Sequence, residues 1–134
     1  MSISDQEIFE IKKFIFQLNS LEEGSIVVVE GKRDSNALSR LGYSGKILEF
    51  NKFRGMVDFT DHVARYKKLI VLFDRDKKGT ELTAKTMHLL QRRTKVDLSY
   101  KKSLQEITSG KIKFIEQMKC YESRIAKDYG QMPF

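Results

Sequence analysis

The sequence predicts an α/β fold in which a mostly parallel sheet of about four strands has helices on both faces. Short β-branched runs alternate with segments of helical periodicity, and this alternation is typical of βαβ units. The apolar runs contain few polar residues, as expected for strands that are buried on both faces. A chain of 134 residues, 40% of them hydrophobic, suits a single domain with one ordinary core.

An additional helix is expected before the first strand, over about residues 5–20. Ser4 begins a Ser-Asp-Gln-Glu capping box with Glu7 at the third helical position. Apolar residues then recur at helical spacing at Ile8, Ile11, Ile15 and Leu18. Three phenylalanines, Phe9, Phe14 and Phe16, lie off this stripe, and packing on the domain is the simplest explanation for them.

Four apolar runs and the turn residues between them predict the remaining elements. Strands are expected at residues 25–29, 46–50, 69–73 and, more weakly and nearer an edge, 95–99. Helices are expected from a cap at Asp34 or Ser35 through Leu41, after Gly55 with Met56, Phe59, Val63 and Tyr66, and from Gly79 through about Arg93. A short helix around Leu104 and Ile107 and a last helix with Ile112, Ile115, Met118 and Ile125 complete the pattern.

The whole chain, 1–134, is expected to form one domain: an N-terminal helix (1–21), a core (24–120) and a C-terminal extension (121–134). No apolar run approaches the ~20 residues of a membrane span, and the polar N-terminus is no signal peptide. A cytoplasmic protein without a membrane partner is therefore expected. The single cysteine, Cys120, excludes an internal disulfide and a multi-cysteine zinc site, and it is expected in the core or at an interface.

The basic residues are unevenly distributed along the chain. The formal net charge is +7, yet residues 1–31 carry a net charge of −4 and the rest of the chain +11. Such an excess indicates either a polyanionic partner or simply a solvated surface, and it bears on association rather than on the fold.

Charged residues follow three of the predicted strands, where open α/β sheets bind their ligands. The three segments are Glu30–Asp34, Asn51–Gly55 and Asp74–Gly79. Their bases are predicted to hold phosphates: Lys32, Arg33, Lys52, Arg54, Arg75, Lys77 and Lys78.

Carboxylates at two of these strand ends predict a divalent cation. Asp74 and Asp76 lie two residues apart, so in an extended chain they point to the same side. Glu30 could reach the same ion if the two strands are neighbours. Carboxylates that are partly desolvated and close together repel one another, and a cation relieves both effects. Mg²⁺ prefers such hard oxygen ligands together with phosphate oxygens, and Mn²⁺ could replace it.

Two segments resemble the signature motifs of the Toprim domain. These are residues 27–34, VVVEGKRD, and residues 72–79, LFDRDKKG. The resemblance covers about residues 24–120 and is closest to small stand-alone Toprim proteins of archaea and bacteria. Residues 104–113, LQEITSGKIK, are also similar to the end of the archaeal versions. Topoisomerases, bacterial-type primases, recombination-repair proteins and ribosomal-RNA maturation nucleases share this domain.

The resemblance implies roles for the matching residues. Glu30 would act as a general acid or base, and Asp74 and Asp76 would coordinate Mg²⁺, so the expected catalytic and metal-binding set is Glu30, Asp74 and Asp76. Gly31 and Gly79 match motif glycines that let the backbone pack close to the site. Asp34 matches a frequent motif aspartate, and a helix cap is an equally good role for it.

Two functions remain open from the sequence. One is a Mg²⁺-dependent nuclease acting on structured RNA or DNA. The other is a non-catalytic RNA- or DNA-binding module, or a subunit of a nucleic-acid processing or repair complex. The nucleophilic-tyrosine domain of topoisomerases and the zinc and helicase-binding domains of primases have no counterpart in these 134 residues. A phosphate-binding P-loop and a dinucleotide fingerprint are missing. A dimer is compatible with the edge strand and the extra helix.

Overall fold

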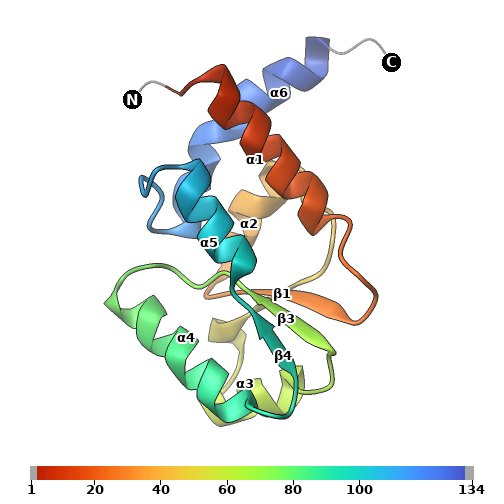
Figure 1. The fold of residues 1–134 in the computed structure, drawn as a ribbon, viewed down its shortest axis with the longest axis vertical. Helices are drawn as coiled ribbons and strands as arrows, with labels where there is room; N and C mark the ends of the chain where they lie inside the picture. The colour runs from red at the N-terminus through yellow and green to blue at the C-terminus, as the bar shows by residue number, and fades with distance from the viewer. Residues whose placement is uncertain (1–2, 132–134) are drawn as a thin grey trace.

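The computed structural model describes residues 3–131 and has a four-stranded sheet at its centre (Figure 1). All strand pairs are parallel and the strand order is β2-β1-β3-β4. The strands are β1 (Ser25–Val29), β2 (Ile47–Glu49), β3 (Lys68–Val71) and β4 (Lys95–Asp97). The predicted α/β class and four-stranded parallel sheet are therefore confirmed.

Six α-helices and two 3₁₀ helices occur within residues 3–131. The α-helices are α1 (Asp5–Leu18), α2 (Lys32–Arg40), α3 (Met56–Val63), α4 (Lys77–Leu90), α5 (Ser99–Ile107) and α6 (Glu122–Gln131). The 3₁₀ helices are η1 (Phe50–Lys52) and η2 (Ile115–Tyr121). No helix in this part of the chain has the length and apolar character needed to cross a membrane.

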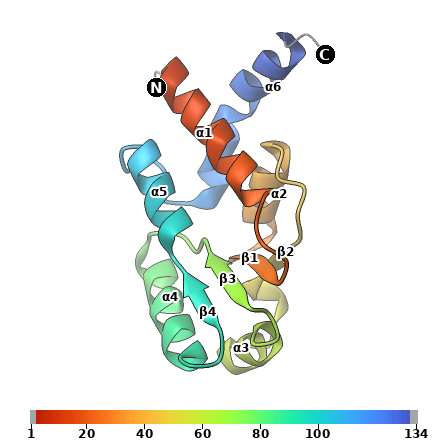
Figure 2. The ribbon, with the colours of Figure 1, turned by 45° about the vertical axis from the view of Figure 1, so that its right-hand side comes forward.

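Helices cover both faces of the sheet, as predicted. Val27 and Val29 of β1 pack in the core formed with α1, α2, α5, η2 and α6. Ile26 and Val28 face the other way and pack with Phe59 and other residues of α3 and α4. The two cores follow from the alternation of side chains along a strand. Figures 1 and 2 show α3 and α4 on one side of the sheet and the other helices on the opposite side.

The N-terminal helix and the C-terminal segment lie side by side (Figure 2). Arg124 of α6 donates hydrogen bonds to the carbonyl of Ile3 at 2.9 Å and to Oδ1 of Asp5 at 2.6 Å. Met118, Tyr121 and Ile125 are buried in the same core as α1. The described part of the predicted extension is therefore packed into the domain, while residues 132–134 and residues 1–2 lie outside the described residues.

Two helices begin earlier than predicted because different residues cap them. The prediction that Asp34 or Ser35 caps α2 is wrong: Gly31 is the N-cap, and Asp34 lies in the first turn. From there its Oδ2 reaches back to accept the Gly31 N–H at 3.1 Å, as in a capping box. Asp76 caps α4, whose first residue is Lys77 rather than Gly79.

Four further expectations need correction. Tyr66 lies beyond the end of α3, and the predicted last helix is divided into η2 and α6, with Ile112 before both. Cys120 is exposed, so of its two predicted positions the core is excluded and the interface remains a prediction. Packing on the domain explains Phe14, which is buried, but not Phe9 and Phe16, whose exposed fractions are 60% and 70%. The helical period placed these phenylalanines correctly on α1, but only the positions of the neighbouring helices decide which of them is covered.

Candidate functional site

Two carboxylates meet at the carboxyl end of the central strands. Glu30 follows β1 and Asp74 follows β3, and these strands are neighbours in the parallel sheet. Oε2 of Glu30 accepts the backbone N–H of Asp74 at 2.8 Å. The strand order thus brings together two residues that are 44 positions apart in the chain.

Asp34 joins them, and we call Glu30, Asp34 and Asp74 the acidic cluster. Glu30 and Asp34 are buried, with exposed fractions of 6% and 8%. Burial raises the pKa of Asp74 to about 7, and a side-chain hydrogen bond with Glu30 and the charges of Asp34 and Glu30 act in the same direction. Burial also raises the pKa of Asp34, and the charge of Glu30 adds to this effect. Nearby like charges and desolvation both disfavour the ionised forms, so the cluster favours binding of a proton or a cation.

Backbone N–H groups of η2 hold two of these carboxylates in place. Oδ1 of Asp74 accepts the N–H of Ile115 at 2.8 Å, and Oδ1 of Asp34 accepts the N–H of Glu116 at 3.2 Å. Hydrogen bonds of this kind stabilise a carboxylate without neutralising it. The acidic cluster is therefore oriented by the start of η2, which the sequence motifs do not include.

An open cleft of about 360 Å³ lies beside the acidic cluster. It is lined by the three acidic-cluster residues and by Gly31, Lys32, Arg33, Asn51 and Glu116. Lys32 and Arg33 are exposed. We call this the acidic cleft; it combines carboxylates with bases that can contact a phosphate.

Asp76 has a different position from its predicted partner Asp74. Oδ1 of Asp76 accepts the N–H of Gly79 at 2.8 Å and so caps α4. Asp76 does not line the acidic cleft. The predicted pair is thus divided: Asp74 belongs to the acidic cluster and Asp76 to a helix cap. Of the two carboxylate oxygens of Asp76, Oδ1 is the one that accepts the capping hydrogen bond.

Most of the predicted phosphate-binding residues are exposed near the strand ends. Only Lys32 and Arg33 line the acidic cleft. Lys52 lies 3.8 Å from a carboxylate oxygen of Glu49. Exposed positions outside the cleft are occupied by Arg54, Lys77 and Lys78.

Arg75 makes structural contacts instead. Its Nε donates to the carbonyl of Ile112 at 3.2 Å, and its Nη2 donates to the carbonyls of Gly110 at 2.7 Å and Ile112 at 3.0 Å. These bonds join the loop after β3 to the segment before η2. Arg75 therefore supports the position of η2 rather than facing the cleft.

The sequence reasoning missed Lys101 in the first turn of α5. Its Nζ lies 3.4 Å from the backbone carbonyl oxygen of Asp74 and 3.3 Å from Oγ1 of Thr83. Burial lowers the pKa of Lys101, while the charges of Glu30, Asp74 and Asp76 oppose this effect. A fourth basic pair, Lys101-Lys102, shortly after the fourth strand was the available signal.

Gly79 is needed for the close approach of α4 to the loop after β3. A Cβ atom built on Gly79 would lie 1.9 Å from the carbonyl oxygen of Asp74. At Gly31 the nearest atom is Nδ2 of Asn51, at 3.0 Å, which is the end of a flexible side chain. The backbone packing expected of the two motif glycines is thus much closer at Gly79.

Within residues 3–131 no three His, Cys, Asp or Glu side chains are arranged so that together they could hold a metal ion. Glu30 and Asp74 nevertheless fit a cation that keeps most of its water ligands. Burial and the charge of Glu30 raise the pKa of Asp74, and a cation bound between the two carboxylates would offset both effects. Mg²⁺ is commonly held by only one or two protein carboxylates.

Relatives of the chain occur in several archaea. A UPF0292 protein of Pyrococcus furiosus is 30% identical over 109 residues, which are 81% of each chain. The chain belongs to the UPF0292 family. A UPF0292 protein of Methanosarcina barkeri is 29% identical over 131 residues, covering 92% of this chain and 91% of its own. Another, from Pyrococcus abyssi, is 33% identical over 93 residues.

A solved structure shares the fold of this UPF0292 chain. It is a protein from Aquifex aeolicus with a TM-score of 0.68 and 26% identity, and the match covers 80% of this chain and 96% of that one. No family model matches the sequence.

Proposed function

We propose that this protein is a small Toprim-type protein that binds RNA or DNA and cleaves its phosphodiester bonds with Mg²⁺. The observation that carries the proposal is the acidic cluster, which lies at the carboxyl ends of the two central strands beside exposed bases. Open α/β sheets bind their ligands at this edge. The two motifs that resemble the Toprim domain contribute all three residues of the cluster.

Carboxylates next to a phosphate-binding surface are compatible with a bound phosphate only if a cation accompanies it. Without one, the cluster would repel a polyanion, and its own side chains repel one another. Glu30 and Asp74 would hold Mg²⁺ or Mn²⁺. When bound, such an ion supplies a Lewis acid that stabilises charge on the phosphate and on the leaving oxygen.

The residues of the chain would share the remaining work. Glu30 would transfer a proton to or from the reacting oxygen, and the N–H of Asp74 orients its carboxylate for this role. Lys32 and Arg33 at the edge of the acidic cleft would hold neighbouring phosphates. Lys101, which contacts the Asp74 carbonyl, would partly offset the negative charge of the cluster.

The position of Asp76 favours a second candidate, a binding module without chemistry of its own. An Asp76 that serves only as a helix cap would leave two carboxylates for the ion. The protein would then recognise RNA or DNA through the charge of the nucleic-acid backbone. It would do so as a monomer, as a dimer, or within a processing or repair complex.

A cleavage assay tests the enzyme. Labelled hairpin RNA and duplex DNA are incubated with the wild-type protein and Mg²⁺ or Mn²⁺. The variants Glu30→Gln and Asp74→Asn are assayed under the same conditions. We expect each variant to cleave at least about 100-fold more slowly, because proton transfer and charge stabilisation are each worth this much or more. Asp61→Asn, at an exposed position of α3, is the matched control and should cleave at the wild-type rate. Equal rates for wild type and both variants would leave only the binding module.

Asp76→Asn separates the two roles of that residue. Asparagine caps helices about as well as aspartate, so the free energy of unfolding should change little. A metal ligand, in contrast, would lose its charge. A rate at least about tenfold below wild type in a fully stable variant would assign Asp76 to the reaction. An unchanged rate would assign it to the cap alone.

A further inference from the structure

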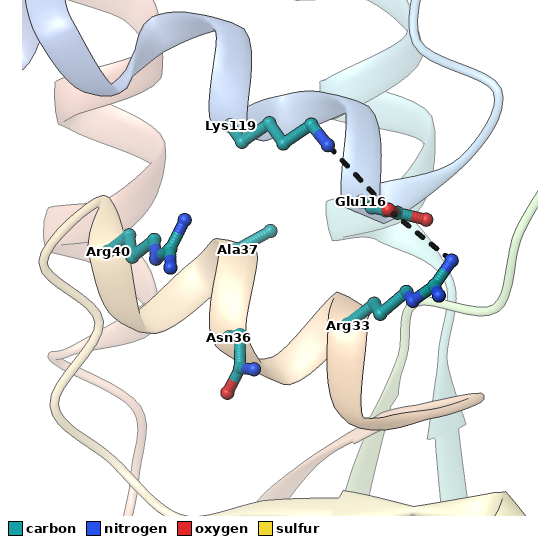
Figure 3. A pocket seen from close by; sticks show the side chains of 6 residues that line it. All are labelled: Arg33, Asn36, Ala37, Arg40, Glu116 and Lys119. Carbon is teal, nitrogen blue, oxygen red and sulfur yellow. Dashed lines mark ion pairs between the residues drawn. The ribbon is translucent and has the colours of Figure 1, made fainter.

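A second pocket, on the far side of Arg33 from the acidic cluster, is enriched in bases. It lies between α2 and η2, has a volume of about 180 Å³, and is shown in Figure 3. We call it the basic pocket; its lining residues are Arg33, Asn36, Ala37, Arg40, Glu116 and Lys119. None of the proposed catalytic residues is among them.

The basic pocket is built from one face of each helix. Arg33, Ala37 and Arg40 are spaced by four and three residues, so they lie along one side of α2. Ala37 is buried, and its small side chain leaves room between the longer ones. From the other side, Glu116 and Lys119 are three residues apart, which aligns them in a 3₁₀ helix. The bond from the Glu116 N–H to Asp34 holds the two walls together.

The bases of the pocket are in excess and weakly engaged. Glu116 is the one carboxylate among the lining residues, and its Oε1 lies 4.0 Å from Arg33 and 3.7 Å from Lys119. Figure 3 shows the two bases approaching Glu116 from opposite walls. Arg40 is 3.9 Å from Glu122, outside the pocket. Long, exposed ion pairs of this kind contribute little to stability, so the bases can exchange them for a ligand at small cost.

The size of the pocket and its position indicate what the ligand is. Sites for complete small molecules are usually about 300–1,000 Å³, so this pocket suits one group of a larger ligand. Arg33 and Glu116 line both the basic pocket and the acidic cleft, so the two hollows share a wall. A chain with repeated phosphates could occupy both at once.

We infer that the basic pocket binds a phosphate group of the nucleic acid whose neighbouring phosphodiester lies in the acidic cleft. This inference rests on the proposed function for its ligand class. Arg40 and Lys119 would be the main contacts, because Arg33 also faces the cleft. The phosphate is either an internal phosphodiester or the 5′-terminal group of the strand; both present anionic oxygens to the three bases, and the terminal group carries the higher charge.

The test is a binding measurement with Ca²⁺ in place of Mg²⁺, so the acidic cleft has a cation, and the labelled strands are checked to be uncleaved after the measurement. Four 3′-labelled 12-nucleotide strands are used: RNA and DNA, each with a 5′-phosphate or a 5′-hydroxyl. Wild type is compared with the double variant Arg40→Gln/Lys119→Gln. The control Lys13→Gln/Lys85→Gln removes the same charge from exposed positions of α1 and α4 that do not line the pocket. Thermal unfolding checks that both variants fold as wild type does.

We expect the pocket variant to bind about tenfold more weakly, and the control less than twofold. The slope of log K against log salt should fall by about 0.7 in the pocket variant, because the pocket holds one phosphate and each single-strand phosphate contact contributes about 0.7. Loss on all strands identifies an internal phosphodiester, and loss confined to 5′-phosphorylated strands identifies the terminal group. Equal binding by the pocket variant and the control, or no binding by wild type, overturns the inference. If the pocket variant loses affinity but wild type cleaves nothing, the basic pocket stands and the nuclease fails.

Discussion

Two groups of buried and half-buried polar residues differ in how their carboxylates are neutralised. Glu7 of α1 accepts hydrogen bonds from Nζ of Lys111 at 2.7 Å and from the hydroxyl of Tyr121 at 2.5 Å. Burial acts to raise the pKa of Glu7, but the bonds from Lys111 and Tyr121 outweigh it, so this pKa is lowered. In the acidic cluster the pKa of Asp74 is instead raised to about 7.

The difference separates a structural carboxylate from those that we propose to be functional. Glu7 joins α1 to the C-terminal segment and is fully paired, so its charge supports the fold. The acidic cluster places like charges together, and the bases near it are the half-buried Lys101 and the exposed Lys32 and Arg33. Such an arrangement opposes folding unless something binds there, and strongly perturbed groups of this kind are concentrated at functional sites.

The largest effect expected is that of Gly79→Ala, which breaks the acidic cluster at its backbone. The new methyl group would clash with the Asp74 carbonyl, which cannot move without displacing the loop after β3. We expect a loss of about 3 kcal/mol in the free energy of unfolding, measured in urea. Gly31→Ala is the control, and it should lose less than about 1 kcal/mol because only the end of the Asn51 side chain must move. Equal losses at the two glycines would refute the close approach at Gly79.

Glu7→Ala tests the paired region. It leaves the Lys111 ammonium and the buried Tyr121 hydroxyl without their acceptor, so we expect a loss of about 2 kcal/mol at pH 7. Because the folded pKa of Glu7 lies below its unfolded value, this contribution is present above about pH 4.5 and is lost as the pH falls through the folded value. Denaturation from pH 3 to pH 7 measures it, with Glu10→Ala as control. A constant difference across this range would contradict the pairing.

Mg²⁺ should stabilise the protein through the acidic cluster. At a free concentration ten times its dissociation constant, a ligand of the folded state adds about 1.4 kcal/mol. We expect this gain at pH 8 for wild type, and almost none for Asp74→Asn, which loses one ligand. Urea titrations with and without the ion measure the gain, and K⁺ at equal ionic strength is the control. The same gain in both proteins would place the ion elsewhere.

The smallest effect is expected for Asp74→Asn in the absence of metal, and its sign is opposite to that of Glu7→Ala. Because the folded pKa of Asp74 is raised, the contribution of Asp74 to stability is fully present below about pH 4 and is lost as the pH rises through about 7. Asparagine carries no charge and can still donate to Glu30, so we expect a gain of about 1 kcal/mol at pH 8, after allowance for partial exposure. The two proteins should be equally stable near pH 4, and a variant that is less stable at pH 8 would argue against repulsion in the cluster.

The sequence by itself determined the order of the strands and helices along the chain. It also determined the two strand ends that carry the acidic cluster. β-branched runs and helical periodicity are local signals, so they predict β1 and β3 and place Glu30 and Asp74 directly after them. The motif resemblance added Asp34 and Gly79. These predictions needed no knowledge of which strands are neighbours.

Only the tertiary structure decided how the side chains at those strand ends are used. Asp76 caps α4, Arg75 supports the segment before η2, and Lys101 contacts the Asp74 carbonyl from α5. The roles of Arg75 and Lys101 depend on partners that other elements supply. The role of Asp76 depends on where α4 begins, which is earlier than its helical periodicity suggests. Hydrogen bonds and desolvation depend on distances in space, and these follow from the packing of η2 and α5 against the sheet rather than from spacing along the chain.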